Sequence, residues 1–255
     1  MEVLTPRGCQ DLATSGAALI EKAAMISEVK TQCALFPPVW KSVLAVVAHP
    51  DDGSVGLGAI LDAFFTAGAR VRVLCLTHGE TWTLHAAPGD LATLRGAELA
   101  SSDDVLGAIR AKLRVNPDGV LGGVCQTRLA NEVVAVAKTS HPDGLLLFDT
   151  AGVTGHLDHQ AATAAGLAAA EMLNLPVLGW TLPEVVAAQL NRDYGATDAW
   201  QGGEDIDLRV TLDRARQRLA GRVQKGRALP GSLLRRRLEL LAETESLRWL
   251  RAPLA

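Results

Sequence analysis

The chain has 255 residues, of which 48% are hydrophobic, and its formal net charge is -3. This length suits one large domain or two small ones, and the apolar content is sufficient to bury a sizeable core. A charge close to neutral, without an acidic or basic tail, argues against nucleic acid as the main partner.

The cysteines and the apolar stretches indicate the cellular compartment. The four cysteines are Cys9, Cys33, Cys75 and Cys125. They form no Cys-x-x-Cys motif and indicate no disulfide framework, which fits a reducing cytoplasm. The start Met1-Glu2-Val3 lacks the basic residues of a signal peptide, and residues 161–170 are too short and too alanine-rich to span a bilayer. We therefore expect a cytoplasmic protein without membrane contact.

The first half of the chain alternates between helical and strand patterns. Residues 1–36 have apolar residues in rough helical spacing, and Pro37-Pro38 ends that segment. Residues 43–48 form a short continuous apolar run, which is typical of a strand buried on both faces. The pattern that follows predicts a helix at 55–67, a strand at 70–77 and a helix at 90–106.

The alternation continues through the second half. Residues 108–124 are ambiguous and suit a weak strand followed by a glycine-rich turn. The next segments predict a helix at 129–139, a strongly apolar strand at 144–149, a helix at 158–173 and a strand at 176–181. Residues 185–210 suit a flexible loop. From Asp213 the pattern is helical and basic, with a break near Pro230-Gly231 and a second helical stretch over 232–250.

Strands that alternate with helices predict an α/β fold, with a mostly parallel sheet and helices on both faces. We expect a single domain over 1–255, with its core at about 43–182, an N-terminal helix at 1–36 and a C-terminal helical extension at about 211–251.

Two short motifs closely follow predicted strands. Ala48-His49-Pro50-Asp51-Asp52 follows the strand at 43–48, and Gly155-His156-Leu157-Asp158-His159 follows the strand at 144–149. Ligands bind at the carboxyl ends of strands in an open parallel sheet, so the motifs would meet if these strands are neighbours. Imidazole nitrogen and carboxylate oxygen suit zinc and similar metals, and a catalytic site keeps one position open for water. The two motifs together predict a mononuclear metal hydrolase.

The spacing of these residues indicates which of them can bind the metal. His49 and Asp52 are three residues apart across a turn that Pro50 stiffens, and His159 begins a helix. These three can bind one metal and leave a position for water, whose pKa falls from about 15.7 to about 7 on zinc.

Three further residues have the chemistry that hydrolysis needs. Asp51 can accept the proton of the water as general base. His156, as imidazolium, would stabilise the oxyanion of the tetrahedral intermediate and protonate the leaving amine. Asp158 is placed to hydrogen-bond His156 and hold its orientation.

At these residues the sequence resembles the PIG-L / LmbE-like family of metal-dependent deacetylases. The family signature is Ala-His-Pro-Asp-Asp after the first strand and Gly-His-x-Asp-His after a later one, and this chain has them at 48–52 and 155–159. Further agreement comes from Leu76-Thr77-His78-Gly79-Glu80 and from Arg95-Gly96-Ala97-Glu98. The resemblance covers approximately residues 43–182.

The resemblance implies a Rossmann-like fold, one Zn²⁺ per chain (or Fe²⁺), and hydrolysis of an N-acetyl group on a small amino-sugar conjugate of the N-acetylglucosamine type. It implies metal binding by His49, Asp52 and His159, and catalysis by Asp51 and His156. It also implies substrate contact by Arg95. A homo-oligomer is left open.

Two positions depart from the family pattern: Gly53 stands where Glu is usual, and Leu157 where Pro is common. Gly53 is the one hint of a different class, a catalytically silent sugar-binding protein on the same scaffold. A third option is an amidase for a larger thiol conjugate or an antibiotic glycoside.

Each feature also has a plain structural interpretation. His-Pro-Asp-Asp can be only a turn, because Pro and Asp are common turn formers. Residues 156–159 can be a capped helix start with Asp158 as a favourable first-turn anion, and Arg95 can be a surface residue. The basic run Arg235-Arg236-Arg237 fits an amphipathic helix whose arginines face water.

Overall fold

The computed structural model describes residues 38–79, 112–194, 200–203, 205–211 and 231–253. All of them belong to one compact unit, Phe36–Ala255. The helices predicted at 1–36 and 90–106 lie outside the described residues, and so does Arg95. The single domain over 1–255 stays a prediction.

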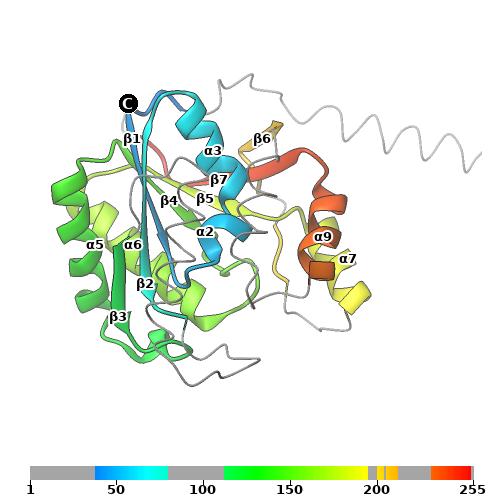
Figure 1. Cartoon of the computed structure of the whole chain (residues 1–255), viewed down its shortest axis with the longest axis horizontal. Coiled ribbons are helices and arrows are strands. Elements are labelled where there is room, and N and C mark those ends of the chain that lie inside the picture. Colours follow the sequence, from blue (N-terminus) through cyan, green and yellow to red (C-terminus); the bar gives the residue numbers. More distant parts are fainter. Residues whose placement is uncertain (1–37, 80–111, 195–199, 204, 212–230, 254–255) are drawn as a thin grey trace, which may run out of the picture. The chain divides into compact units, whose positions relative to one another are not determined.

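The described part of the chain forms an open seven-stranded sheet in the order β3-β2-β1-β4-β5-β7-β6 (Figure 1). The strands are β1 Ser42–Val47, β2 Arg70–Thr77, β3 Lys112–Asn116, β4 Gly144–Phe148, β5 Val177–Thr181, β6 Leu208–Thr211 and β7 Thr244–Arg251. The strands from β3 to β5 are mutually parallel, whereas β7 runs antiparallel to β5 and to β6. A mostly parallel sheet is therefore confirmed, and β1 and β4 are neighbours, as the meeting of the two motifs requires.

Helices cover both faces of the sheet (Figure 1). They are α2 Asp52–Val55, α3 Gly58–Thr66, α5 Gln126–Ser140, α6 Leu157–Leu173, α7 Glu184–Tyr194 and α9 Gly231–Leu241, with a short 3₁₀ turn, η1, at Leu121–Gly123. Side chains of α5 and α6 pack in one apolar core, and those of α3, α7 and α9 pack in the other.

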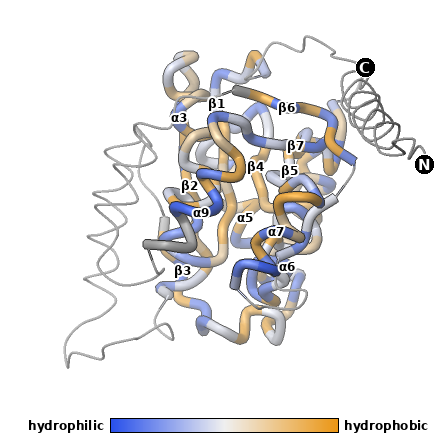
Figure 2. The backbone as a smooth tube through the Cα atoms, turned by 90° about the vertical axis from the view of Figure 1, so that its right-hand side faces the viewer, coloured by the Kyte–Doolittle hydropathy of each residue, from blue (hydrophilic) through white to orange (hydrophobic). Residues whose placement is uncertain are grey.

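The alternation along β1 explains both cores. Val43, Ala45 and Val47 face the core that contains α3, whereas Leu44 and Val46 face the core that contains α6. Successive side chains of a strand point to opposite faces, so a strand covered on both faces must be apolar throughout. Figure 2 shows the same hydrophobic character along β4.

Helix α6 packs closely on β4. A Cβ atom at Gly166 would lie 2.6 Å from Leu147 Cδ2, so only glycine permits this approach. Alanines dominate the buried face of the same helix. The close packing fixes the start of α6, which carries the second motif, beside the carboxyl end of β4.

The C-terminal region differs from its prediction. Helix α9 is present, but it ends at Leu241, and residues 244–251 form strand β7 in place of the expected helix. Residue Ala242 has a φ of 49°, which breaks the helix, and pairing with β5 then outweighs helical propensity. The predicted loop at 185–210 is likewise wrong, because it contains most of α7 and the start of β6.

Within the described ranges, no helix is both long and apolar enough to cross a bilayer.

Candidate metal centre

The carboxyl ends of β1 and β4 bring the two motifs together. The strands pair in parallel, with Val43 opposite Gly144 and Ala45 opposite Leu146. The first motif then turns into α2, and the second runs from the loop after β4 into the first turn of α6. Their convergence follows from sheet topology, as the sequence predicts.

The loop before α6 has an unusual backbone. Gly152, Val153 and Gly155 have φ values of 75°, 61° and 68°. Val153 is β-branched and fully buried, and a left-handed conformation at such a residue costs about 1–3 kcal/mol. The Gln201 N–H donates to the Val153 carbonyl at 2.6 Å. The surrounding structure thus holds the loop in a shape that directs the Gly152 carbonyl toward His159.

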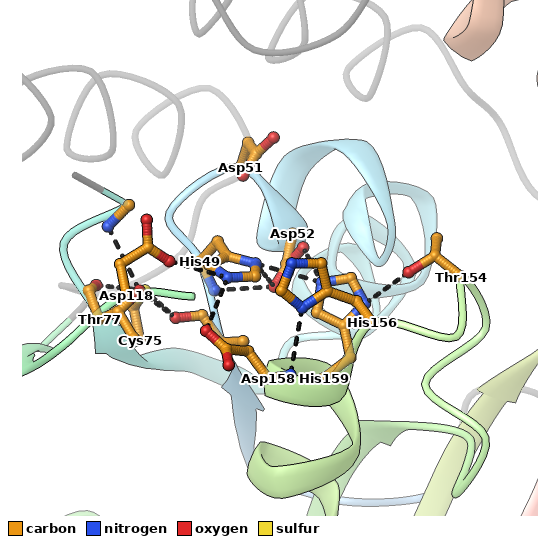
Figure 3. A network of polar contacts seen from close by, with 12 residues as sticks. His49, Asp51, Asp52, Cys75, Thr77, Asp118, Thr154, His156, Asp158 and His159 are labelled. Carbon is orange, nitrogen blue, oxygen red and sulfur yellow. Dashed lines mark hydrogen bonds and ion pairs between the residues drawn. The ribbon is translucent and has the colours of Figure 1, made fainter. Parts of the chain in front are cut away.

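His49, Asp52 and His159 lie within reach of one another, as Figure 3 shows. His49 Nδ1 is 3.2 Å from His159 Nε2. Asp52 Oδ1 is 3.1 Å from His159 Nε2, and Asp52 Oδ2 is 3.5 Å from His49 Nδ1. Asp52 Oδ2 also accepts a hydrogen bond from the His49 backbone N–H at 2.8 Å, which fixes the carboxylate.

The hydrogen bonds of His159 determine which ring nitrogen faces this cluster as an acceptor. His159 Nδ1 lies 3.0 Å from the Gly152 carbonyl and 3.0 Å from Thr154 Oγ1. A carbonyl oxygen only accepts, so Nδ1 must carry the proton. In the neutral ring the lone pair of Nε2 then points at Asp52 and His49, which is the orientation of a metal-ligating histidine.

His49 is oriented in the same way from the opposite side. Its Nε2 lies 3.1 Å from Asp118 Oδ1 and 3.4 Å from Asp158 Oδ2. Carboxylates accept, so Nε2 carries a proton, and in the neutral ring Nδ1 would present its lone pair to His159. With both rings neutral, two imidazole lone pairs would face each other beside a carboxylate, which favours a positive charge between them. The donor set of two nitrogens and one carboxylate therefore fits a divalent cation such as zinc.

The pKa values of these groups reflect the same charge balance. Burial acts to lower the pKa of His49, but the carboxylates of Asp118, Asp158 and Asp52 outweigh burial and raise it to about 12. Burial acts to raise the pKa of Asp52, yet His159 and His49 hold it well below its ordinary value. The pKa of His159 is raised, against the effect of burial, by Asp52. The cluster stabilises positive charge between the imidazoles.

His156 caps the N-terminus of α6. Its Nδ1 accepts a hydrogen bond from the Asp158 backbone N–H at 3.1 Å, so the proton of the neutral ring is on Nε2. The rings of His156 and His49 are 4.9 Å apart, edge to face. Burial and the positive charge of His49 and His159 lower the pKa of His156. The ring beside the cluster is thus a fixed Nε2–H donor.

Asp158 has a different contact from the one predicted. Its carboxylate accepts from the backbone N–H groups of Gly119 at 2.7 Å and Leu121 at 2.8 Å, and it lies beside His49. Burial acts to raise the pKa of Asp158, but His49 and the two backbone N–H groups lower it. The side chain therefore joins α6 to the loop after β3, and it is the Asp158 backbone that orients His156.

Asp51 lies outside the cluster. In Figure 3 its side chain is on the far side of the loop from His156 and His159, with the carboxylate turned away from the imidazoles. Among the predicted site residues in the described ranges, His49, Asp52, His156, Asp158 and His159 come together and Asp51 is adjacent. Gly53 lies in α2, where an added Cβ would meet only Val73 Cγ1 at 3.7 Å.

Asp118 belongs to the site and was not predicted from the sequence. It follows β3 in the turn Asn116-Pro117-Asp118-Gly119, at the same edge of the sheet as both motifs. Its position after a weak strand was the available signal, because polar residues at strand ends collect at this edge. The ambiguous pattern of 108–124 concealed it.

The family model described as PIG-L, GlcNAc-PI de-N-acetylase, matches residues 44–170. This range contains both motifs and all the residues of the cluster.

The chain belongs to the PIG-L family.

Individual relatives agree with this membership. A 1D-myo-inositol 2-acetamido-2-deoxy-alpha-D-glucopyranoside deacetylase of Kineococcus radiotolerans is 28% identical over 196 residues, which are 61% of this chain and 54% of the relative. The chain thus spans little more than half the length of this curated relative.

Solved structures show that other proteins share the fold of this PIG-L chain. An N,N'-diacetylchitobiose deacetylase from Pyrococcus horikoshii has a TM-score of 0.62 at 18% identity, and the match covers 92% of each chain. A 4-carboxy-2-hydroxymuconate hydratase from Pseudomonas putida has a TM-score of 0.64 at 16% identity, over 84% of this chain and 98% of that one. One of these proteins is a deacetylase and the other is a hydratase, so the fold alone does not determine the reaction.

Proposed function

We propose that this PIG-L protein is a metal-dependent hydrolase that removes an N-acetyl group from a small amino-sugar conjugate of the N-acetylglucosamine type. The observation that carries the proposal is the approach of His49 Nδ1 and His159 Nε2 to 3.2 Å beside the Asp52 carboxylate. The family match and the names of the curated relatives support deacetylation as the reaction.

His49, Asp52 and His159 would hold the metal, for which we propose zinc, with iron as the alternative. A divalent cation there would acidify water and polarise the acetyl carbonyl. The protein's own residues then perform the proton transfers. Asp51 turns toward the site and takes a proton from the attacking water. His156 Nε2–H donates to the carbonyl oxygen as negative charge develops on it.

Collapse of the tetrahedral intermediate breaks the C–N bond. The proton that Asp51 holds passes to the departing nitrogen, which leaves as the free amine while acetate is released. Asp118 and Asp158 keep His49 in the orientation that directs Nδ1 into the cluster. Asp158 also ties the loop after β3 to α6, so one carboxylate orients two parts of the site.

The test is an amine-release assay on N-acetylglucosamine glycosides with protein that has been stripped by chelator and then supplied with Zn²⁺ or Fe²⁺. We expect one metal per chain, release of equal amounts of amine and acetate, and loss of both on chelation. Asp52→Asn should lose metal binding and activity together. His141→Asn is a matched control, because His141 is exposed, lies outside the cluster and has a left-handed φ of 46° that asparagine tolerates.

The same assay separates the alternatives. A silent sugar-binding protein would bind the glycoside and release no amine at saturating metal. An amidase for a larger thiol conjugate or an antibiotic glycoside would release amine only from those compounds.

A further inference from the structure

One arginine of the basic run at 235–237 does not face water. The side chains of Arg235 and Arg236 are 76% and 38% exposed, and both pair with acidic groups at the surface. Arg237 is only 3% exposed. Burying a guanidinium costs free energy unless other groups replace its water, so its position in the fold calls for a specific role.

Arg237 contacts the C-terminal end of α2, the helix that begins with Asp52. A guanidinium N–H donates to the Val55 carbonyl, the last residue of α2. The last carbonyls of a helix receive no hydrogen bond from an N–H group of the same helix. A cation at that end also interacts favourably with the helix dipole. Helix α2 has four residues and begins with Asp52. Arg237 therefore holds the opposite end of the turn that carries a predicted metal ligand.

The same guanidinium reaches the second motif through aromatic rings. Arg237 Cζ lies 5.1 Å from the centre of the Trp180 ring, and the Trp180 N–H donates to the buried Glu245 at 2.7 Å. Trp180 packs on Phe148 with ring centres 5.0 Å apart, and Phe148 packs edge-on against His159 at 4.9 Å.

Phe148 also contacts the end of α2. A Cβ atom at Gly56 would lie 2.7 Å from Phe148 Cζ, so the two are in close contact. The rings and the carbonyl contact thus connect α9 to both sides of the cluster. This is the arrangement of an outer residue that supports ligands without touching them.

We infer that Arg237 is a positioning residue for the metal centre, which anchors α2 through the Val55 carbonyl and supports His159 through Trp180 and Phe148. This inference rests on the proposed metal site. It predicts that metal affinity depends on a side chain of the C-terminal helix, outside the range that the family model matches.

The test measures Co²⁺ affinity of the full-length chain by calorimetry and by the visible absorption of the bound ion. Arg237→Met removes the donor and the charge but keeps an unbranched apolar side chain. We expect its Co²⁺ affinity to fall by about 10-fold, the lower end of the range for residues that hydrogen-bond a metal ligand directly, because Arg237 acts through intervening groups. Arg236→Met is the matched control and should bind Co²⁺ as the wild type does.

Arg237→Lys keeps the charge and one donor but loses the planar stacking on Trp180. We expect an intermediate loss of affinity and faster amide exchange in peptides that contain residues 52–57. It also provides the test if Arg237→Met does not fold, which loss of near-ultraviolet circular dichroism would report. A folded Arg237→Met or Arg237→Lys with wild-type Co²⁺ affinity would overturn the inference. A wild-type chain that binds no Co²⁺ would instead refute the metal site itself.

Discussion

Asp118 and His49 make a contact that connects the loop after β3 to the candidate metal centre: Asp118 Oδ1 lies 3.1 Å from His49 Nε2, and the Asp118 side chain is 2% exposed. We predict that Asp118→Ala lowers Zn²⁺ affinity by about 10- to 100-fold, because the His49 ring loses the acceptor that directs Nδ1 at the cluster. Asp118→Asn should lose less, since the amide oxygen still accepts. Competition with a chromophoric chelator measures both affinities.

Asp205→Asn is the control for this series, because Asp205 is an exposed carboxylate outside the cluster. Equal Zn²⁺ affinities for Asp118→Ala and the wild type would show that the ring needs no support from β3.

The contact also shows where prediction from the sequence succeeds. The central strands are predicted nearly to the residue, because a strand buried on both faces is apolar along most of its length: residues 43–48 and 144–149 correspond to β1 and β4. His49 and His159 could be paired in advance because parallel neighbouring strands end at one edge. Asp118 could not be assigned to the site in advance, because the strand before it is hard to recognise. Strand β3 lies at the sheet edge, and its five residues, Lys112–Asn116, include two cations and an asparagine.

The prediction for residues 244–251, which form strand β7, is wrong for a different reason. The pattern over 232–250 predicts one helix, but residues 244–251 pair with β5 and β6 instead. The partner of Glu245 is the indole of Trp180, 65 residues away in sequence. Contacts between residues so far apart in the sequence produce no periodic pattern from which they could be predicted. Burial of Arg237 was missed for the same reason, because its partners Val55 and Trp180 are both distant in sequence.

Replacement of Asp51 tests the assignment of the general base. We predict that Asp51→Asn binds Zn²⁺ within about twofold of the wild type, since its carboxylate is turned away from the cluster in Figure 3. Its kcat should fall by about 10²- to 10⁴-fold, the usual contribution of a positioned base. Metal analysis and amine release on the same samples give both values.

Asp52→Asn provides the contrast, because it should lose metal as well as turnover. If Asp51→Asn had the kcat of the wild type, Asp51 would not be the general base. The candidates would then be Asp118 and Asp158, the carboxylates that contact His49 Nε2.

Two glycines that follow the first motif, one in α2 and one at its C-terminal end, should respond to alanine in opposite ways. At Gly53 an added Cβ meets only Val73 Cγ1 at 3.7 Å, so Gly53→Ala should stabilise α2 by roughly 0.5–1 kcal/mol through helix propensity. At Gly56 the Cβ would lie 2.7 Å from Phe148 Cζ and 2.8 Å from the Asp52 carbonyl, so Gly56→Ala should be destabilising.

Thermal unfolding of the metal-free proteins compares the two variants. A lower melting temperature for Gly53→Ala than for Gly56→Ala would mean that glycine at 53, where the family usually has Glu, is required by the local packing.

Cys125 should be a reactive thiol. It is exposed at the N-terminal end of α5, where the backbone N–H groups of Arg128 and Thr127 lower its pKa. Because the thiolate is the nucleophile, more of Cys125 reacts at neutral pH, and its rate of alkylation by iodoacetamide should reach half its maximum at a lower pH than that of free cysteine.

Peptide mapping by mass spectrometry follows each cysteine separately. The buried Cys75 serves as the internal control and should react only on unfolding. A pH profile for Cys125 that matches free cysteine would contradict the predicted stabilisation of its thiolate.

A crystal structure with Zn²⁺, with anomalous scattering recorded on both sides of the zinc absorption edge, tests the central claim most directly. The account predicts a single strong peak about 2.0–2.2 Å from His49 Nδ1, from His159 Nε2 and from one oxygen of Asp52. A protein that remains folded but has no peak between these atoms, or that binds its zinc elsewhere, would contradict it.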